Sequence, residues 1–396
     1  MEVTAQAEAV MLLTVSFGKL ESEAANPLTP TEWGAFAGWL TERNLVPSDL
    51  LKGRLSELLQ DWEHPKVTVD RLNALLNRGA TLGFALEKWQ RAGLWVVTRS
   101  DPEYPKRLKE HLRQTAPPML FGCGNKNLLN ANSIAVVGSR HADSADVSFA
   151  ENIGRRVAEC GRLVVSGGAA GVDQAAMFGA LNAEGTVIGI LADNLFRSAT
   201  SAKYRRHLMS GDLTLISPFN PEMRFFVGNA MARNKYVYCL AEEAVVVSSA
   251  RDNGGTWNGA VENLNNGWTP VWIKRTESPG SGNSHLVELG GRWLERLDDL
   301  VQTESGGGQQ PNTQGDDIQP LHLQVSVDPA EELYKKVRSL VTDLCAEPKQ
   351  AVEMADALRV TKRQADTWIK LLVDDGVLQK VTRPVRYVVR EKDLIS

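Results

Sequence analysis

The segment from Ile134 to Leu181 most constrains what this chain can fold into, because it places two wholly apolar strands ahead of two glycine-bearing turns. Strands of this kind are typical of a parallel sheet covered on both faces. In such a sheet the turns and helix N-termini that follow the strands lie along one edge, where backbone N–H groups attract anions. The segment therefore predicts an anion-binding edge in an α/β domain.

The middle of the chain continues this alternation of strand and helix. Six apolar segments are predicted strands: Ile134 to Val137, Leu163 to Val165, Thr186 to Leu191, Leu213 to Ile216, Glu243 to Ser248 and Thr269 to Lys274. Helical patterns separate most of them, which predicts right-handed crossovers and a Rossmann-like doubly wound parallel sheet. A short strand is also expected from Leu94 to Thr98.

Composition and pattern divide the chain into four parts. Residues 1–95 carry helix-period apolar patterns and predict an N-terminal helical region, with a capping box at Thr29-Pro30-Thr31-Glu32 and a core-facing Trp33, Phe36 and Trp39. Residues 96–302 form the predicted Rossmann-like domain. Residues 303–330 are poor in large apolar groups and predict a flexible linker, and residues 331–396 predict a separate small domain.

The small domain has the element order of a winged helix-turn-helix. Thr361 is the expected N-cap of its third helix. The candidates for contact with duplex DNA are Lys362, Arg363, Arg383 and Arg386. Residues 331–396 hold 13 basic against 11 acidic side chains, so a degenerate module that contacts protein is the alternative.

Net charge and cysteine spacing exclude several classes of protein. A formal net charge of −4 argues against a surface that coats nucleic acid or membrane, so a polyanion site must be a local patch. The four cysteines are far apart and form no CxxC pair, which favours unpaired thiols over disulfides or a zinc site. With no leader-like start and no apolar run long enough to span a bilayer, a cytoplasmic protein without membrane contact is expected.

Three glycine-bearing turns and one basic segment make up the candidate phosphate-binding site. Neither of the first two turns matches a dinucleotide or P-loop pattern, so no cofactor and no metal are expected. Arg140 could clamp a phosphate with two hydrogen bonds; its alternative role is a surface ion pair. The candidate residues are Gly138, Ser139 and Arg140; Ser166, Gly167, Gly168 and Gly171; Arg233, Asn234 and Lys235; and Gly254, Gly255 and Thr256.

Two carboxylates lie near these turns. Asp173 would repel a phosphate, so we favour a structural role in the first turn of the following helix over a bond to a sugar or base edge. Glu262 comes six residues after Thr256 and is more often a surface residue in such a position. No GxSxG, no HExxH and no close set of His, Cys and acid is present, so no catalytic residues are predicted.

Four motifs in order resemble the DNA-processing protein A (DprA/Smf) family. They are VVGSR, SGGAAGVDQAAM, ARNKYVYCLAEEAVVVSSA and RDNGGTWNGA. The lead-in DPEYPKRLKEHLRQTAPPMLFGCGN and the terminal winged helix also fit the family's domain order. The chain departs from the family at Met177, where His is usual, at Lys235, where a second Arg is usual, and in lacking Phe-Pro before the Arg-Asn pair.

The resemblance implies a protein that binds single-stranded DNA without sequence preference, forms a homodimer and loads a RecA-type recombinase in transformation, or serves a related duty in recombination or phage defence. By position, Ser139 and Arg140, Ser166 to Gly168 with Gly171, and Arg233 to Lys235 would line the phosphate track. One alternative is a nucleotide sensor or nucleoside-phosphate N-glycosidase of the wider superfamily, using Glu262 or Asp173 on the ribose. Another is a protein-binding, antitoxin-like regulator.

Overall fold

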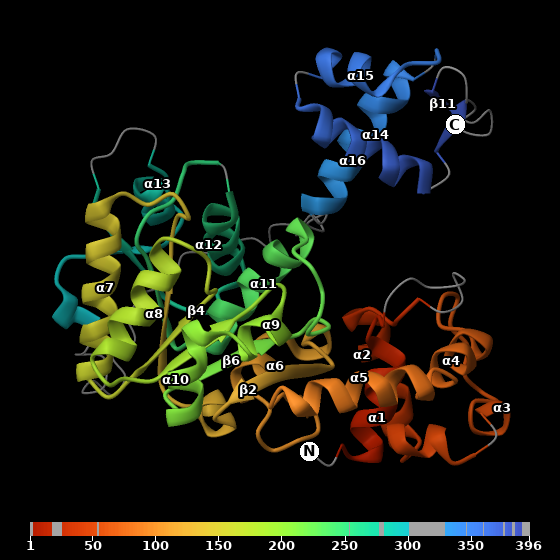
Figure 1. Ribbon diagram of the computed structural model, residues 1–396, viewed down its shortest axis with the longest axis horizontal. Coiled ribbons are helices and arrows are strands. Elements are labelled where there is room, and N and C mark those ends of the chain that lie inside the picture. The colour runs from red at the N-terminus through yellow and green to blue at the C-terminus, as the bar shows by residue number, and fades with distance from the viewer. Residues whose placement is uncertain are drawn as a thin grey trace, which may run out of the picture. The chain divides into compact units, whose positions relative to one another are not determined.

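The computed structural model describes residues 3–17, 26–53, 55–252, 254–276, 281–300, 329–345, 347–358, 360–374, 377–381 and 385–389. The chain forms two compact units, Met1–Gln309 and Gln310–Ser396 (Figure 1). The predicted N-terminal helical region and the predicted Rossmann-like domain both lie in the first unit. The predicted linker at 303–330 lies outside the described residues, apart from its last two positions.

Within the described residues, the first unit is built on a nine-stranded sheet. From β6 to β9 the neighbouring strands are parallel, whereas β1 and β2 add to one edge in antiparallel fashion. All six predicted parallel strands and the predicted strand before them are present, so the predicted α/β, Rossmann-like sheet is confirmed. The spatial order is β1 (Trp95–Thr98), β2 (Met119–Gly124), β6 (Leu213–Ser217), β5 (Val187–Ile190), β4 (Leu163–Ser166), β3 (Ser133–Val137), β7 (Glu243–Val246), β8 (Val271–Lys274) and β9 (Arg292–Leu294).

Side chains alternate between two cores, one on each face of the sheet. Ile134 and Val136 of β3 belong to one core, and Ala135 and Val137 belong to the other, as the two-residue period of a strand requires. The first core is covered by α7 (Ser144–Glu159), α8 (Val172–Asn182), α9 (Leu195–Ala199) and α10 (Ala202–Ser210), and the second by α6 (Lys106–Leu112), α11 (Val227–Leu240), α12 (Gly254–Asn266) and α13 (Asn283–Glu288).

The N-terminal helices share the first of these cores. Trp33 and Phe36 are buried and Trp39 packs against them, which confirms that these aromatics are core residues. The predicted capping box is also present, since Thr29 Oγ1 accepts from the Glu32 N–H at 3.2 Å and Glu32 Oε2 accepts from the Thr29 N–H at 2.9 Å. The helices are α1 (Ala5–Thr14), α2 (Pro30–Glu42), α3 (Leu55–Leu58), α4 (Val69–Leu76) and α5 (Gly79–Arg91).

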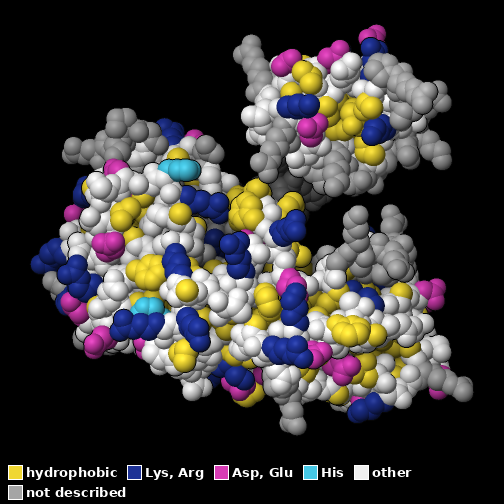
Figure 2. All heavy atoms as spheres, viewed as in Figure 1, with side chains coloured by type: hydrophobic (Ala, Val, Ile, Leu, Met, Phe, Trp, Pro, Cys, Tyr) yellow, Lys and Arg dark blue, Asp and Glu magenta, His cyan; other side chains and the backbone are white. Residues whose placement is uncertain are grey.

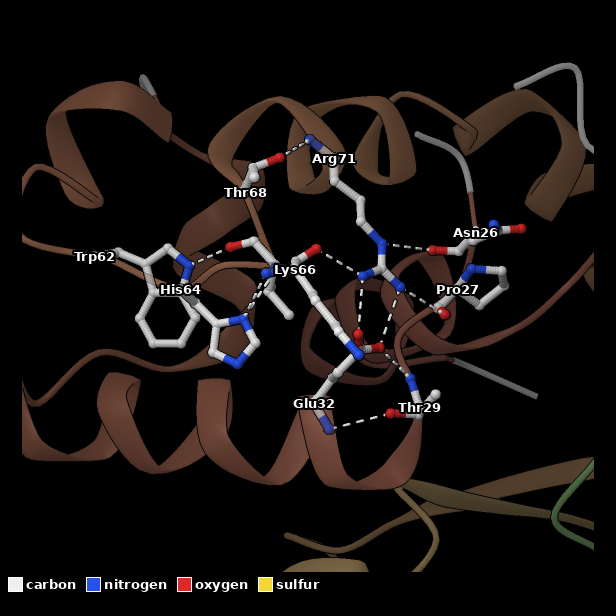
Figure 3. A network of polar contacts seen from close by, with 10 residues as sticks. Asn26, Pro27, Thr29, Glu32, Trp62, His64, Lys66, Thr68 and Arg71 are labelled. Atoms are coloured by element: carbon white, nitrogen blue, oxygen red, sulfur yellow. Dashed lines mark hydrogen bonds and ion pairs between the residues drawn. The ribbon is translucent and has the colours of Figure 1, made fainter. Parts of the chain in front are cut away.

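Arg71 of α4 fastens the start of α2 to the segment before it (Figure 3). Its guanidinium donates to both carboxylate oxygens of Glu32 at 3.0 and 3.1 Å, and to the carbonyl oxygens of Asn26, Pro27 and Lys66 at 3.0, 3.0 and 2.8 Å. Partial burial raises the pKa of Glu32, but the hydrogen bonds from Arg71 and from the backbone at the start of α2 outweigh it. The net effect holds the Glu32 pKa below its usual value.

The second unit has its own apolar core, which includes Val341, Met354 and Ile369. Thr361 caps the third helix, because its Oγ1 accepts from the Gln364 N–H at 3.3 Å. This order of elements agrees with the predicted winged helix-turn-helix, but the assignment stays a prediction. The elements are α14 (Pro329–Leu344), α15 (Ala351–Ala357), α16 (Lys362–Asp374) and an antiparallel pair, β10 (Leu378–Val381) and β11 (Arg386–Val389).

Two further predictions concern the cysteines and membrane-spanning segments. All four cysteines are free thiols, as their spacing predicted. Across the described ranges, none of the helices combines the length and the apolar character needed to cross a bilayer.

Candidate functional site

The candidate site lies where the strand order reverses. β3 pairs in parallel with β4 on one side and with β7 on the other. In doubly wound sheets, ligands bind outside the carboxyl ends of the strands at this reversal. The turns that follow β3, β4 and β7, which start at Gly138, Gly167 and Val247, therefore share one edge of the sheet.

The first two turns are packed directly against each other. A Cβ on Gly171, whose φ is +82°, would lie 2.5 Å from the carbonyl oxygen of Ser139, and a Cβ on Gly138 would lie 2.6 Å from Cγ2 of Val172. The Val172 N–H donates to that same Ser139 oxygen at 3.3 Å. The glycines thus let the N-terminus of α8 approach the turn that carries Arg140.

A buried ion pair lies beneath these turns. Asp173 and Arg233 are 6% and 5% exposed, and their Oδ2 and Nη1 atoms are 3.9 Å apart. The Asp173 carboxylate also accepts a hydrogen bond from the Ala169 N–H at 3.3 Å and another from the backbone N–H of Gly138. One carboxylate therefore joins the first turn, the second turn and α11, which favours the structural role expected for Asp173.

Burial dominates the electrostatics of this pair. It raises the pKa of Asp173, and Arg233, the two backbone N–H groups and Arg140 act in the opposite direction. Burial also lowers the pKa of Arg233, although a guanidinium stays charged at neutral pH. The 3.9 Å separation is longer than a hydrogen bond, and Nε of Arg233 has no hydrogen-bond partner among the described residues. Arg233 thus keeps hydrogen-bonding capacity under the turns.

Arg140 lies at the exposed mouth of the first turn. Its Cζ is 5.4 Å from the centroid of the Phe225 ring, and it forms no ion pair with any residue that the structure describes. The alternative role of Arg140, a surface arginine paired to an acid, therefore lacks support within those ranges. Its charge is available to an anion at the edge of the sheet.

Three of the predicted track residues have specific places in the fold. The Ser166 hydroxyl is fully buried and donates to the Val136 carbonyl at 2.6 Å, so it is not available to a ligand. Asn234 and Lys235, like Arg233, lie inside α11. Because successive residues turn by about 100° around a helix, Arg233 and Lys235 point in nearly opposite directions.

Asn234 serves to join two helices. Its Nδ2 donates to the Gly255 carbonyl of α12 at 2.9 Å, and a Cβ on Gly259 would lie 3.1 Å from the Asn234 Cβ. The Arg233 side chain lies under the second turn at Gly167, and the Asn234 side chain contacts the third turn at Gly255. That residues 233–235 line one phosphate track stays a prediction.

The third turn leads directly into α12. Gly254, Gly255 and Thr256 are the first residues of that helix, and its N-terminus brings unsatisfied N–H groups to the carboxyl edge. Glu262 lies eight residues after Gly254, the first residue of the helix, which is about 12 Å along the helix axis at 1.5 Å per residue. It is therefore remote from the edge, which weakens its predicted alternative role on a ribose.

Sequence reasoning missed two features of this edge. Asn283 is fully buried and ties the ends of β7 and β8 together, donating to the Val247 and Lys274 carbonyls at 3.1 and 2.8 Å. Phe225 and Phe226, just before α11, are 50% and 59% exposed. The signal available for the phenylalanines was an apolar run in a loop that ends at a helix start.

Basic side chains are locally concentrated on the first unit. On the face drawn in Figure 2, Lys and Arg side chains cross the region over α9, α10 and α11, with few Asp and Glu side chains between them. In the described ranges, no group of three or more His, Cys, Asp or Glu side chains could hold a metal ion. At the turns themselves, the cationic groups are the guanidiniums of Arg140 and Arg233, and the N-termini of α8 and α12 add backbone N–H groups.

The motifs and this fold match one protein family. A family model described as DNA recombination-mediator protein A matches residues 95–305, which is more than half of the chain. The chain belongs to this family. The matched range contains every turn of the candidate site.

Individual relatives agree. Putative DNA processing protein DprA of Mycobacterium tuberculosis is 28% identical over 232 residues, covering 55% of this chain and 59% of the relative. The chain thus spans about three fifths of that relative's length. DNA processing protein DprA of Streptococcus pneumoniae is 27% identical over 204 residues, or 51% of this chain and 71% of the relative. The X-ray structure of DprA from Streptococcus pneumoniae covers 76% of this chain and 98% of its own, with a TM-score of 0.58 and 18% identity, and supports the fold.

Proposed function

We propose that this chain binds single-stranded DNA without sequence preference and acts in DNA processing linked to recombination. The observation that carries the proposal is the convergence of two glycine turns, the N-termini of α8 and α12, the exposed Arg140 and the buried Arg233 at one edge of the sheet. Backbone N–H groups and guanidinium groups bind phosphate oxygens and carry no base information. Such a site suits a phosphodiester backbone of any sequence.

A polymer suits this edge better than a dinucleotide. Asp173 is enclosed by Arg233 and two backbone N–H groups, so its carboxylate is already engaged and does not serve as the ribose-binding acid of a Rossmann-type cofactor site. Several phosphate-binding elements in a row instead fit a groove that follows a strand. The names of the matched relatives, which are DNA processing proteins, agree with this proposal.

Partners beyond DNA stay predictions. Loading of a RecA-type recombinase and homodimer formation are expected from the family resemblance. Contact of the second unit with duplex DNA is likewise a prediction. Lys362 and Arg386 are exposed, and the side chain of Arg363 and all of Arg383 lie outside the described residues.

Strand binding can be measured directly. The full chain should bind a fluorescent oligo-dT strand more tightly than a duplex of equal length, and its affinity should fall steeply as salt rises, because phosphate contacts release counterions. Arg140→Ala should weaken binding about tenfold across unrelated sequences, whereas Arg91→Ala, an exposed change on α5, should not. Equal or absent binding at low salt would contradict the proposal. Release of free base from nucleoside monophosphates, lost in Glu262→Ala, would favour the N-glycosidase alternative.

A further inference from the structure

An exposed apolar patch, Phe225–Val227, lies at the start of α11. The side chains of Phe225, Phe226 and Val227 are 50%, 59% and 63% exposed. Three consecutive large apolar side chains facing solvent are uncommon in a folded chain, and such patches mark binding surfaces. The patch is therefore a candidate contact surface that the phosphate-binding turns do not explain.

The place of the patch in the fold is informative. α11 leads into β7 and runs antiparallel to it, so the first residues of α11 lie at the carboxyl edge that carries the glycine turns. Arg140 of the first turn lies over the Phe225 ring at 5.4 Å from its centroid. The aromatic surface is thus continuous with the candidate phosphate track.

The local backbone holds the second ring in place. A Cβ on Gly228 would lie 2.5 Å from Cε1 of Phe226, so the Phe226 ring packs over the backbone at Gly228. Arg224 precedes the two rings and is also exposed. The two exposed rings thus follow Arg224 in the chain, and the Arg140 guanidinium lies over the first of them.

We propose that Phe225 and Phe226 form a stacking platform for the unpaired bases of a DNA strand whose phosphates lie on the glycine turns. The proposal rests on the proposed function and adds how the site selects its substrate. Bases in a duplex already stack on each other, whereas bases of a single strand can stack on an aromatic ring whatever their identity. Phosphate contacts alone do not make this distinction. The platform therefore gives the chain its preference for single strands.

The test separates bases from phosphates. Full-length protein is titrated at low salt with a dT 20-mer, with a 20-mer in which abasic residues replace every thymidine, and with a 20-base-pair duplex. We expect the wild type to bind dT at least tenfold more tightly than the abasic strand. Phe225→Ala/Phe226→Ala should weaken dT binding about ten- to a hundredfold, given typical stacking contributions, and change abasic binding less than threefold.

Three controls make the result specific. Phe84→Ala removes an even more exposed ring, 77% exposed on α5, and should change neither affinity. Phe225→Tyr/Phe226→Tyr keeps both rings and should keep the preference for dT. Arg140→Ala should weaken binding of both the dT and the abasic strand, because both carry the phosphates. A 2-aminopurine base in the strand should lose fluorescence on binding to wild type and much less with the alanine variant.

Each contrary result has a separate meaning. If the wild type binds no strand at low salt, the proposed function fails and the platform fails with it. If the wild type binds dT and the abasic strand equally, or if the alanine variant loses both equally, the platform is wrong while strand binding stands. If the alanine variant keeps its dT preference but changes from dimer to monomer in sedimentation, the patch is a contact between copies of the chain and the platform is again wrong.

Discussion

Gly167 shows at the scale of single residues how the second turn depends on α11. A Cβ at this position would lie 1.3 Å from Nη1 of Arg233 and 2.6 Å from Oδ2 of Asp173. The requirement for glycine here is steric, because the buried pair occupies the space that a side chain would need. Any larger residue must displace the guanidinium or the turn.

Gly167→Ala should therefore weaken single-strand binding about tenfold or more, with a loss of thermal stability, because Arg233 and the turn cannot both keep their positions. Binding is measured by anisotropy with oligo-dT. Gly83→Ala is the matched control: a Cβ there meets nothing within 4 Å in α5, so it should raise stability by up to about 1 kcal/mol and leave binding unchanged. An unaltered affinity of Gly167→Ala for oligo-dT would show that binding of single-stranded DNA does not depend on the position of Arg233.

Some residues of the site could be predicted from the sequence and others could not. Gly138 and Arg140 were found because a strand followed by a glycine turn is a local pattern. The Ser166 hydroxyl donates to the carbonyl of Val136, 30 positions earlier, and the Asn234 amide donates to the carbonyl of Gly255, 21 positions later. Such pairings arise from packing, and a single sequence gives no direct sign of them.

At the scale of elements, the strands also divide into those that a local sequence pattern predicts and those that depend on packing. Six of the seven described parallel strands were predicted because they are largely apolar on both faces, whereas the three-residue β9, with its exposed Arg292, was not. The antiparallel β2 was also missed, since Pro117-Pro118 precedes it and glycines occupy positions 122 and 124. In the fold, Gly122 lies under the Trp95 ring, where a Cβ would be 2.3 Å from Cη2. The glycine that weakens the strand signal is the residue that the packing requires.

The link between α2 and α4 leads to a prediction about pH. Because the Glu32 pKa is held below its usual value of 4.5 in the folded chain, its stabilising contribution is fully present above that pH and is lost as the pH falls through the lower, folded-state pKa. Glu32→Gln should lower the free energy of unfolding at pH 7 by about 2 kcal/mol, since it weakens two charge-assisted hydrogen bonds from Arg71.

The difference between Glu32→Gln and wild type should shrink as the pH falls below about 4.5, as measured by urea unfolding at several pH values. Glu87→Gln is the control, because the exposed pair of Glu87 with Arg91 on α5 should contribute less than about 0.5 kcal/mol. A difference that is constant from pH 7 to pH 3 would show that the charge of Glu32 is not what stabilises α2.

At the scale of the whole molecule, the chain divides into two compact units. The family match at residues 95–305 lies within the first unit, and every glycine turn of the site lies there too. The second unit has a core of its own. The two units therefore do not depend on each other for their apolar cores, and the N-terminal helices belong with the sheet because they share its first core.

We accordingly expect that a chain ending at residue 309 keeps its affinity for oligo-dT within about threefold, because all residues of the proposed phosphate and base contacts lie in the first unit. Anisotropy with the truncated and full-length proteins, at matched salt, measures this. A loss of tenfold or more would mean that the second unit contributes to the interface. In that case Lys362→Glu/Arg386→Glu in the full chain should cause the same loss if exposed cations of α16 and β11 touch DNA, and no loss if the second unit acts through protein contacts.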